Sequence, residues 1–345
     1  MHSFSSDKIP VAVLGATGIV GQAFCLLLAD HPVFELACLT GSDSRANQIF
    51  SRDINWHLPL AMPDYLKDLP LSCFSMDELS RKNIKIVFCA LPTDVAKEIE
   101  PKLRDSGYFV FSNAGVNRLS LEVPLIIPEI NASSISLIGK QGFPQNGFVV
   151  CNSNCAVSGL ALAVAPLIKF GIKKVIVATY QSLSGAGYPG VASLDALGNI
   201  IPFIPGEEDK IGVELSKIIG HEIPVSATCV RVPVLFGHTE AVWIECEQRP
   251  SEKDIIRSWN EFSYNDASLK TLPDKPLTYH ENSNYPQPRT AFHGNPFGMT
   301  VEIGRLQTTP DGFKFVLMVN NLIRGAAGGS VANAELFVSR YGECL

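Results

Sequence analysis

The sequence predicts an α/β protein built on two sheets, a parallel one in the first half and a large mixed one in the second. Up to about residue 150, short apolar runs alternate with helix-like segments, which is typical of a parallel sheet with helices on both faces. Beyond that point long strand-like runs follow one another. With 345 residues the chain is long enough for two domains. We expect the first at 1–150, joined by a C-terminal helix at 325–345, and the second at 151–324.

The first half opens with a strand, a glycine turn and a helix. Residues 11–14 are apolar and form the strand, and the helix continues through residues 22–28 to stop at His31-Pro32. Further strands are predicted at the apolar runs 34–40, 84–92 and 108–115.

A helix-like segment at 93–107 separates two of these strands. Its apolar residues Val95, Ile99 and Leu103 recur at helical spacing, so we expect them to share the buried face of an amphipathic helix.

The second half begins with a helix that is apolar on nearly all sides, at 155–171, with Gly171 as its stop. A long proline-rich segment at 271–298 is expected to be a loop, either a lid, an interface arm or an ordinary surface loop. The last segment, 325–342, reads as a helix. Strands are predicted at 173–185, 225–235, 240–247, 299–307 and 313–322.

Charge and composition exclude several classes of protein. The net charge is −6 and no basic run stands out, so nucleic acid is not an expected partner, and an anionic substrate must be met by local cations. No apolar stretch reaches about 18 residues, so no membrane span is expected. The N-terminus lacks the pattern of a signal peptide, and nine scattered cysteines read as reduced thiols, so we expect a cytoplasmic protein.

Gly15, Gly18 and Gly21 follow the first strand directly and form a G-x-x-G-x-x-G motif. Glycines in this position permit a tight turn and let a pyrophosphate approach backbone N–H groups at a helix N-terminus. Because a strand precedes the motif and a helix follows it, we predict a Rossmann-type dinucleotide-binding domain. The alternative is a glycine turn inside an unrelated α/β fold.

The end of the second strand bears on which nicotinamide cofactor is bound. An NAD site usually places an acidic side chain there, to hold the ribose 2′-hydroxyl. Here Ser42 and Arg45 suit a 2′-phosphate, although Asp43 could serve the NAD role. We favour NADP.

Two cysteines, Cys151 and Cys155, lie four residues apart in "FVVCNSNCAVSG". No further cysteine or histidine pair stands near them, so we expect no metal site. Cys151 ends an apolar run and reads as a buried strand residue. Cys155 opens the buried helix, where the helix dipole favours a thiolate, so it is either a covalent nucleophile or a structural thiol.

Several motifs occur in an order that resembles one family. They are "VLGATGIVGQ", "SNCAVSGLALAVAPL", "QSLSGAGYPG", "GEEDKI", "RVPVLFGHTEAV" and "NNLIRGAAGGSVANAELF". Together they resemble the aspartate-semialdehyde dehydrogenases, in the branch found in archaea and fungi. The resemblance implies a Rossmann-type domain followed by an α+β catalytic and dimerisation domain. It also implies a homo-oligomer, dimer or tetramer, with the long loop at the subunit contact.

The same resemblance implies an activity, the reductive dephosphorylation of aspartyl phosphate with NADPH to aspartate semialdehyde, through a thioester on a cysteine. It makes Cys155 the nucleophile, His238 the general acid/base, and Gln181 the amide that orients the substrate. An imidazole whose pKa is about 6.5 would suit that role at neutral pH. The implied substrate contacts are Arg231 for the carboxylate, Glu207 for the amino group, and Lys210 and Arg118, with Asn113 beside it, for the phosphate. The implied cofactor contacts are Gly15, Thr17, Gly18, Ile19, Val20, Gly21, Ser42, Arg45, Pro92, Gly185 and Asn321.

Other interpretations stay open at this stage. His293 is the one rival to His238, and the charges around Glu207 could be a solvated helix start. Gly115 and Gly198 depart from the family pattern and put fine contacts in doubt. A malonyl-CoA reductase shares the scaffold, an N-acetyl-glutamyl-phosphate reductase fits less well, and a non-catalytic dinucleotide-binding protein is a hypothesis of another class.

Overall fold

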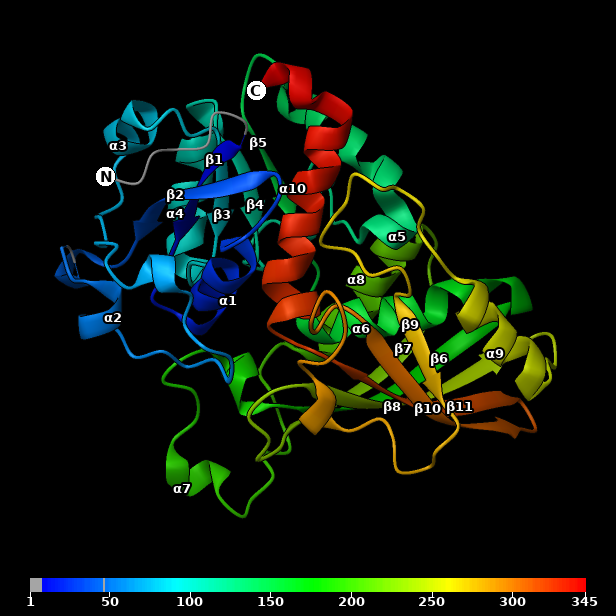
Figure 1. Ribbon diagram of the computed structural model, residues 1–345. Coiled ribbons are helices and arrows are strands. Elements are labelled where there is room, and N and C mark those ends of the chain that lie inside the picture. The colour runs from blue at the N-terminus through cyan, green and yellow to red at the C-terminus, as the bar shows by residue number, and fades with distance from the viewer. Residues whose placement is uncertain (1–7, 46) are drawn as a thin grey trace.

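A computed structural model describes residues 8–45 and 47–345, apart from the side chain of Asp43, and contains two sheets (Figure 1). The first sheet is wholly parallel, with strand order β2-β1-β3-β4-β5. Every residue of its three last strands is buried, as expected for a parallel sheet covered on both faces. Its strands are β1 (Ile9–Leu14), β2 (Phe34–Thr40), β3 (Ile86–Cys89), β4 (Phe109–Ser112) and β5 (Phe148–Cys151).

Helices from both ends of the chain cover this sheet. The C-terminal helix α10 (Gly328–Tyr341) contacts α1 (Ile19–Leu28) and strands β3 and β4 (Figure 1). Its Phe337 ring lies 4.8 Å from the ring of Phe148, inside an aromatic cluster. A five-residue π-helix, Ile323–Ala327, leads into α10. The shorter helices are α2 (Phe50–Asp53), α3 (Met76–Arg81) and α5 (Pro128–Asn131).

Helix α4 (Thr93–Asp105) packs on β4 and β5 but buries a face other than the one we expected. Its buried residues are Ala96, Glu100 and Leu103. Val95 is 44% exposed, and both Val95 and Ile99 line a cleft. Val95 therefore faces that cleft instead of the core, while Ile99 borders the cleft and also packs against the core, a difference that a periodicity argument cannot express.

The second sheet is mixed, with strand order β7-β6-β8-β11-β10-β9. The pairs β6–β7 and β9–β10 are parallel and the others are antiparallel. One face is covered by α6 (Cys155–Val164), α8 (Glu208–Ile219) and α9 (Glu252–Glu261). A short helix, α7 (Ser193–Ala196), lies in a separate loop (Figure 1). The strands are β6 (Ile172–Gln181), β7 (Val225–Arg231), β8 (His238–Cys246), β9 (Leu277–His280), β10 (Val301–Thr309) and β11 (Gly312–Val319).

The segment 271–298 is not entirely a loop. It contains β9, which adds to the edge of the mixed sheet beside β10. A strand of only four residues is difficult to predict from the sequence here, because the prolines before and after it are typical of a loop. Its place at a subunit contact stays a prediction. Among the described residues, no helix is long and apolar enough to cross a membrane.

Candidate active site

The turn between β5 and α6 sets the position of Cys155. The Asn154 side chain caps α6, since its Oδ1 accepts hydrogen bonds from the backbone N–H groups of Ala156 at 2.9 Å and Val157 at 3.3 Å. This cap holds Cys155 in the first turn of the helix. Cys151, by contrast, is fully buried at the end of β5. The two thiols that look alike in the sequence therefore occupy different environments.

Cys155 lies against His238, the first residue of β8. Its Sγ is 3.1 Å from His238 Nε2. On the other side of the ring, Nδ1 accepts a hydrogen bond from the backbone N–H of Ser182 at 3.0 Å. A nitrogen that accepts an N–H carries no proton of its own, so we assign the proton of the neutral ring to Nε2. The ring therefore points an N–H group at the sulfur.

Burial governs the protonation of this pair. It raises the pKa of the Cys155 thiol to about 12, and Glu207 adds to that effect. The pKa is lowered by the charges of Arg118 and Arg231 and by the backbone N–H of Ala156, but these contributions are smaller than the effect of burial. Burial, with the charge of Arg231, lowers the pKa of His238 to about 3. Desolvation therefore outweighs the thiolate-favouring effect of the helix start on Cys155, and it lowers the pKa of His238 below the expected value of about 6.5.

These shifts predict a slow reaction of Cys155 with iodoacetamide at pH 7. A raised pKa leaves the thiol protonated at neutral pH, and only the thiolate is nucleophilic. The rate should increase about tenfold per pH unit through the mildly alkaline range, as the thiolate fraction grows. Mass spectrometry of the labelled peptide measures it. A rate already maximal at pH 7 would show that the dipole outweighs burial after all.

A chain of hydrogen bonds joins the residues expected to hold the amino-acid end of a substrate. Arg231 Nη1 donates to Gln181 Oε1 at 3.4 Å and to the carbonyl oxygen of Ser182 at 2.9 Å. Gln181 Nε2 lies 3.3 Å from Glu207 Oε1, which also accepts from Asn154 Nδ2 at 2.6 Å. Arg231, Gln181 and Glu207 are all buried. This series of hydrogen bonds thus runs from Arg231, the candidate for binding the carboxylate, to Asn154, the residue before Cys155.

Two buried acids in or near this series of hydrogen bonds, Glu207 and Glu240, have different surroundings. Glu207 accepts two hydrogen bonds, and Lys210 Nζ lies 3.8 Å from its Oε2. Glu240, two residues after His238, has no partner for either oxygen among the described residues. Burial, with the charge of Glu207, raises the pKa of Glu240 well above its ordinary value. Burial therefore favours the protonated, neutral form of Glu240.

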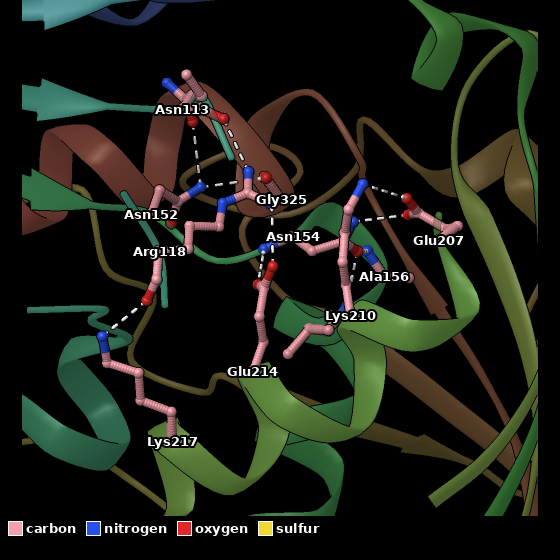
Figure 2. A network of polar contacts seen from close by, with 12 residues as sticks. Asn113, Arg118, Asn152, Asn154, Ala156, Glu207, Lys210, Glu214, Lys217 and Gly325 are labelled. Atoms are coloured by element: carbon pink, nitrogen blue, oxygen red, sulfur yellow. Dashed lines mark hydrogen bonds and ion pairs between the residues drawn. The ribbon is translucent and has the colours of Figure 1, made fainter. Parts of the chain in front are cut away.

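Of the anion-binding candidates, Arg118 and Asn113 meet on the other side of the same turn, whereas Lys210 lies beside Glu207 (Figure 2). Arg118 Nη2 donates to the carbonyl oxygen of Asn113 at 2.7 Å, and Nη1 lies 3.3 Å from Glu214 Oε1. Arg118 Nε and Asn113 Nδ2 are buried donors without a partner in the described structure. Together with Lys210 they provide the local cations and donors that an anion needs in a protein of net negative charge.

A cleft of about 900 Å³ lies over the glycine turn. Gly15 adopts a φ of +79°, and a Cβ there would lie 2.7 Å from the carbonyl oxygen of Ala90, so only glycine fits. The open backbone, the helix start behind it and Ser42 at the far strand end suit a dinucleotide phosphate. Of the expected cofactor residues, those lining the cleft are Gly15, Thr17, Gly18, Ile19, Val20, Ser42 and Pro92.

The other four expected cofactor residues lie elsewhere. Gly21 serves close packing, because a Cβ there would come within 2.1 Å of the Gly15 carbonyl oxygen. Arg45 ends a short 3-10 helix beside Gly41, which does line the cleft. Gly185 packs against His238 and Arg231. Asn321 is buried, and its amide bonds Ser182, Ser184 and the N–H of Gly237.

Sequence reasoning missed several functional side chains. Asn154, Ser182 and Glu214 all contact candidate catalytic or binding residues, and only Asn154 had a signal, as a cap residue before a helix. His293 lies outside the network around Cys155, so it is not a rival to His238. The described residues hold no cluster of potential metal ligands.

Comparison with known proteins agrees with this geometry. A family model for the NAD-binding domain of semialdehyde dehydrogenases matches residues 10–138, and one for their dimerisation domain matches residues 164–324. The chain is 41% identical to the aspartate-semialdehyde dehydrogenase of Archaeoglobus fulgidus, over 96% of this chain and 98% of that protein. It is 32% identical to a malonyl-CoA reductase (NADP) of Metallosphaera sedula, over 96% and 97%.

A solved structure gives the same result for the fold. The crystal structure of an aspartate-semialdehyde dehydrogenase with NADP from Candida albicans superimposes with a TM-score of 0.84 at 31% identity, covering 98% of this chain and all of that one. The similarity spans both sheets and the cleft above the glycine turn.

Proposed function

The chain belongs to the aspartate-semialdehyde dehydrogenase family, and from this premise we propose how its site reduces L-aspartyl 4-phosphate to L-aspartate 4-semialdehyde. The family uses NADPH for this step of the aspartate pathway, which leads to lysine, methionine and threonine. The bound cofactor supplies a hydride. The residues of this chain bind the substrate, provide the nucleophile and stabilise negative charge.

Cys155 carries the covalent steps. The thiol first loses its proton to solvent. The thiolate then attacks the acyl carbon, the carbon–oxygen bond to phosphate breaks, and orthophosphate leaves as a thioester forms. A cofactor held over the glycine turn would supply the hydride to the same carbon, whose oxygen would then carry the negative charge. Breakage of the carbon–sulfur bond then releases the aldehyde and returns the thiolate. In the reverse direction, phosphate captures the thioester.

His238 acts on these steps as a neutral hydrogen-bond donor. Its Nε2–H, 3.1 Å from the sulfur, stabilises the thiolate and then the oxyanion that forms next to it. A low pKa keeps the ring uncharged across the physiological range. The bond from Ser182 to Nδ1 fixes the tautomer that this role requires.

The two ends of the substrate are held by different groups. Arg231 pairs with the α-carboxylate, and Glu207 takes the ammonium group. Lys210 and Arg118 meet the phosphoryl group, with Asn113 as an added donor. Gln181 contacts both Arg231 and Glu207, so it sets the distance between the two charged groups.

The single observation that carries this proposal is the buried Glu207, which accepts hydrogen bonds from Gln181 and Asn154 in the network that ends beside Cys155. Its Oε2 lies 3.8 Å from Lys210 Nζ, a long contact, and the ammonium group of aspartyl phosphate would add a second cationic partner for this buried acid. A malonyl thioester has none, so the malonyl-CoA reductase activity of one relative is not favoured here.

The test is oxidation of aspartate semialdehyde with NADP, followed by NADPH absorbance, with and without phosphate. We expect turnover that depends on phosphate and does not respond to coenzyme A. Parallel assays with malonyl-CoA and NADPH provide the comparison. A protein that ignores phosphate and reduces malonyl-CoA would overturn the proposal.

Arg45 offers a test of cofactor choice. We propose that it holds the 2′-phosphate of NADPH, because it lies beside the cleft at the end of β2. Arg45→Ala should raise the Michaelis constant for NADPH by about ten- to a hundredfold, the contribution of one charge-assisted hydrogen bond, and change that for NADH little. Steady-state kinetics with both cofactors decides this. Equal changes would remove Arg45 from the role and favour Asp43 as a ribose ligand.

The matched dimerisation domain makes the protein a homo-oligomer, with the dimer as its basic unit. We propose that dimers form through the face of the mixed sheet opposite α6, where Tyr180 and Trp243 are 41% and 38% exposed. Trp243→Glu should then yield monomers in analytical ultracentrifugation. Leu121→Glu, at a loop residue that is 85% exposed, is the control and should stay oligomeric. The wild-type mass also shows whether dimers pair into tetramers.

We also propose a cytoplasmic, reducing compartment. All nine cysteines are free, and six of them are buried. Microscopy of a tagged chain in its own cells tests this, and an exported protein would contradict it.

A further inference from the structure

Glu214 is a buried acid that connects two parts of the active site. It lies on α8 and is 1% exposed. Its Oε2 accepts a hydrogen bond from the backbone N–H of Asn154 at 2.6 Å, and its Oε1 accepts one from Arg118 Nη1 at 3.3 Å (Figure 2). Asn154 precedes the nucleophile, and Arg118 comes from the loop after β4. One carboxylate therefore bridges the covalent centre and the anion-binding arginine.

The contacts of Arg118 leave its Nε–H without a partner among the described residues. Glu214 and the carbonyl oxygen of Asn113 occupy Nη1 and Nη2. Nε itself is buried. A guanidinium held at both terminal nitrogens cannot rotate about its long side chain, so the direction of its Nε–H is fixed.

The same face of α8 holds the loop that carries Arg118. Lys217, three residues after Glu214, donates from Nζ to the carbonyl oxygens of Arg118 and Ser120 at 2.7 Å and of Val123 at 2.9 Å. Glu207, Lys210, Glu214 and Lys217 are spaced by three, four and three residues, which places them on one side of the helix. This side thus carries the residues that we propose for the ammonium end of the substrate, Glu207, and for its phosphoryl end, Lys210, together with the acid that holds Arg118.

We propose that Glu214 is a positioning residue for the phosphoryl group, which it serves by fixing Arg118 relative to the Cys155 turn. This inference rests on the proposed function, because it assumes that an acyl phosphate is the substrate. The acid does not touch the reacting atoms. It acts through Arg118 on one side and through the Asn154 backbone on the other.

The test compares Glu214→Gln with the wild type in the oxidative direction. A glutamine amide has one acceptor where the carboxylate uses two, so one of the two bonds must be lost. We expect the Michaelis constant for phosphate to rise about tenfold or more, and that for NADP to stay unchanged. Asp209→Asn removes the same charge from an exposed position on the same helix and should leave both constants as they are.

A double variant separates positioning from a general structural role. In an Arg118→Ala background, Glu214→Gln should add no further loss of phosphate affinity, because its route to the phosphate is already gone. Additive losses, or equal rises for phosphate and NADP, would overturn the proposal.

Glu214→Asp keeps the charge and replaces Glu214→Gln if that variant fails to fold. We expect a smaller rise in its Michaelis constant for phosphate, and an unchanged constant would count against the proposal. A wild type indifferent to phosphate would overturn the proposed function as well, whereas a phosphate-dependent wild type with an unaffected Glu214→Gln would overturn this inference alone.

Discussion

Cys155→Ser should fold, bind NADP and lose turnover by about four orders of magnitude or more, as expected when an active-site nucleophile is removed. A serine hydroxyl in the same place has almost no ionised form at neutral pH. The site around it would stay intact, because the Asn154 cap and the network through Glu207 do not use the sulfur. Activity assays together with fluorescence titration of NADPH measure both parts of this prediction.

Cys151→Ser is the matched control, four residues earlier in the same stretch. Its thiol is fully buried in β5, and burial raises its pKa. Exchange for a hydroxyl places a polar group in an apolar strand, at a cost of about 1–3 kcal/mol in the free energy of unfolding. We expect a lower melting temperature and nearly normal turnover. An inactive Cys151→Ser beside an active Cys155→Ser would reverse the assignment of the nucleophile.

Much of this arrangement could be predicted from local sequence. Gly15, Gly18 and the strand before them indicated the dinucleotide cleft, because a glycine turn between a strand and a helix has few other uses. Cys155 could be separated from Cys151 because a polar turn and a helix start leave a clear pattern. Both features depend on neighbours in the chain.

The remaining features depend on contacts between distant segments. Glu214 looks like any charged residue of an amphipathic helix, and only the fold brings it to Arg118, 96 positions away. The protonation of His238 depends on its complete burial and on Arg231, neither of which a sequence pattern expresses. The cleft-facing Val95 has the same periodicity as a core residue.

His238→Ala should reduce turnover by about 10²- to 10³-fold, the loss seen when one donor to a developing oxyanion is removed. If the ring works as a neutral donor, His238→Gln should recover part of that loss, because its side-chain amide also carries N–H groups. The wild-type pH profile supplies a second readout. The pKa of His238 is lowered to about 3, so the ring stays neutral as the pH rises through 5, 6 and 7, and it contributes no change in this window.

The ionisation that does shape the profile is that of Cys155. Its pKa is raised, so the thiolate is scarce at neutral pH and increases as the pH rises. The rate constant kcat/KM should therefore climb with pH on a single limb, and that limb should persist in His238→Gln at a lower level. A wild-type inflection near pH 6.5 that vanishes in both variants would instead show that His238 exchanges a proton during turnover, as a general acid/base. In that case glutamine, which cannot take up a proton, would be no better than alanine.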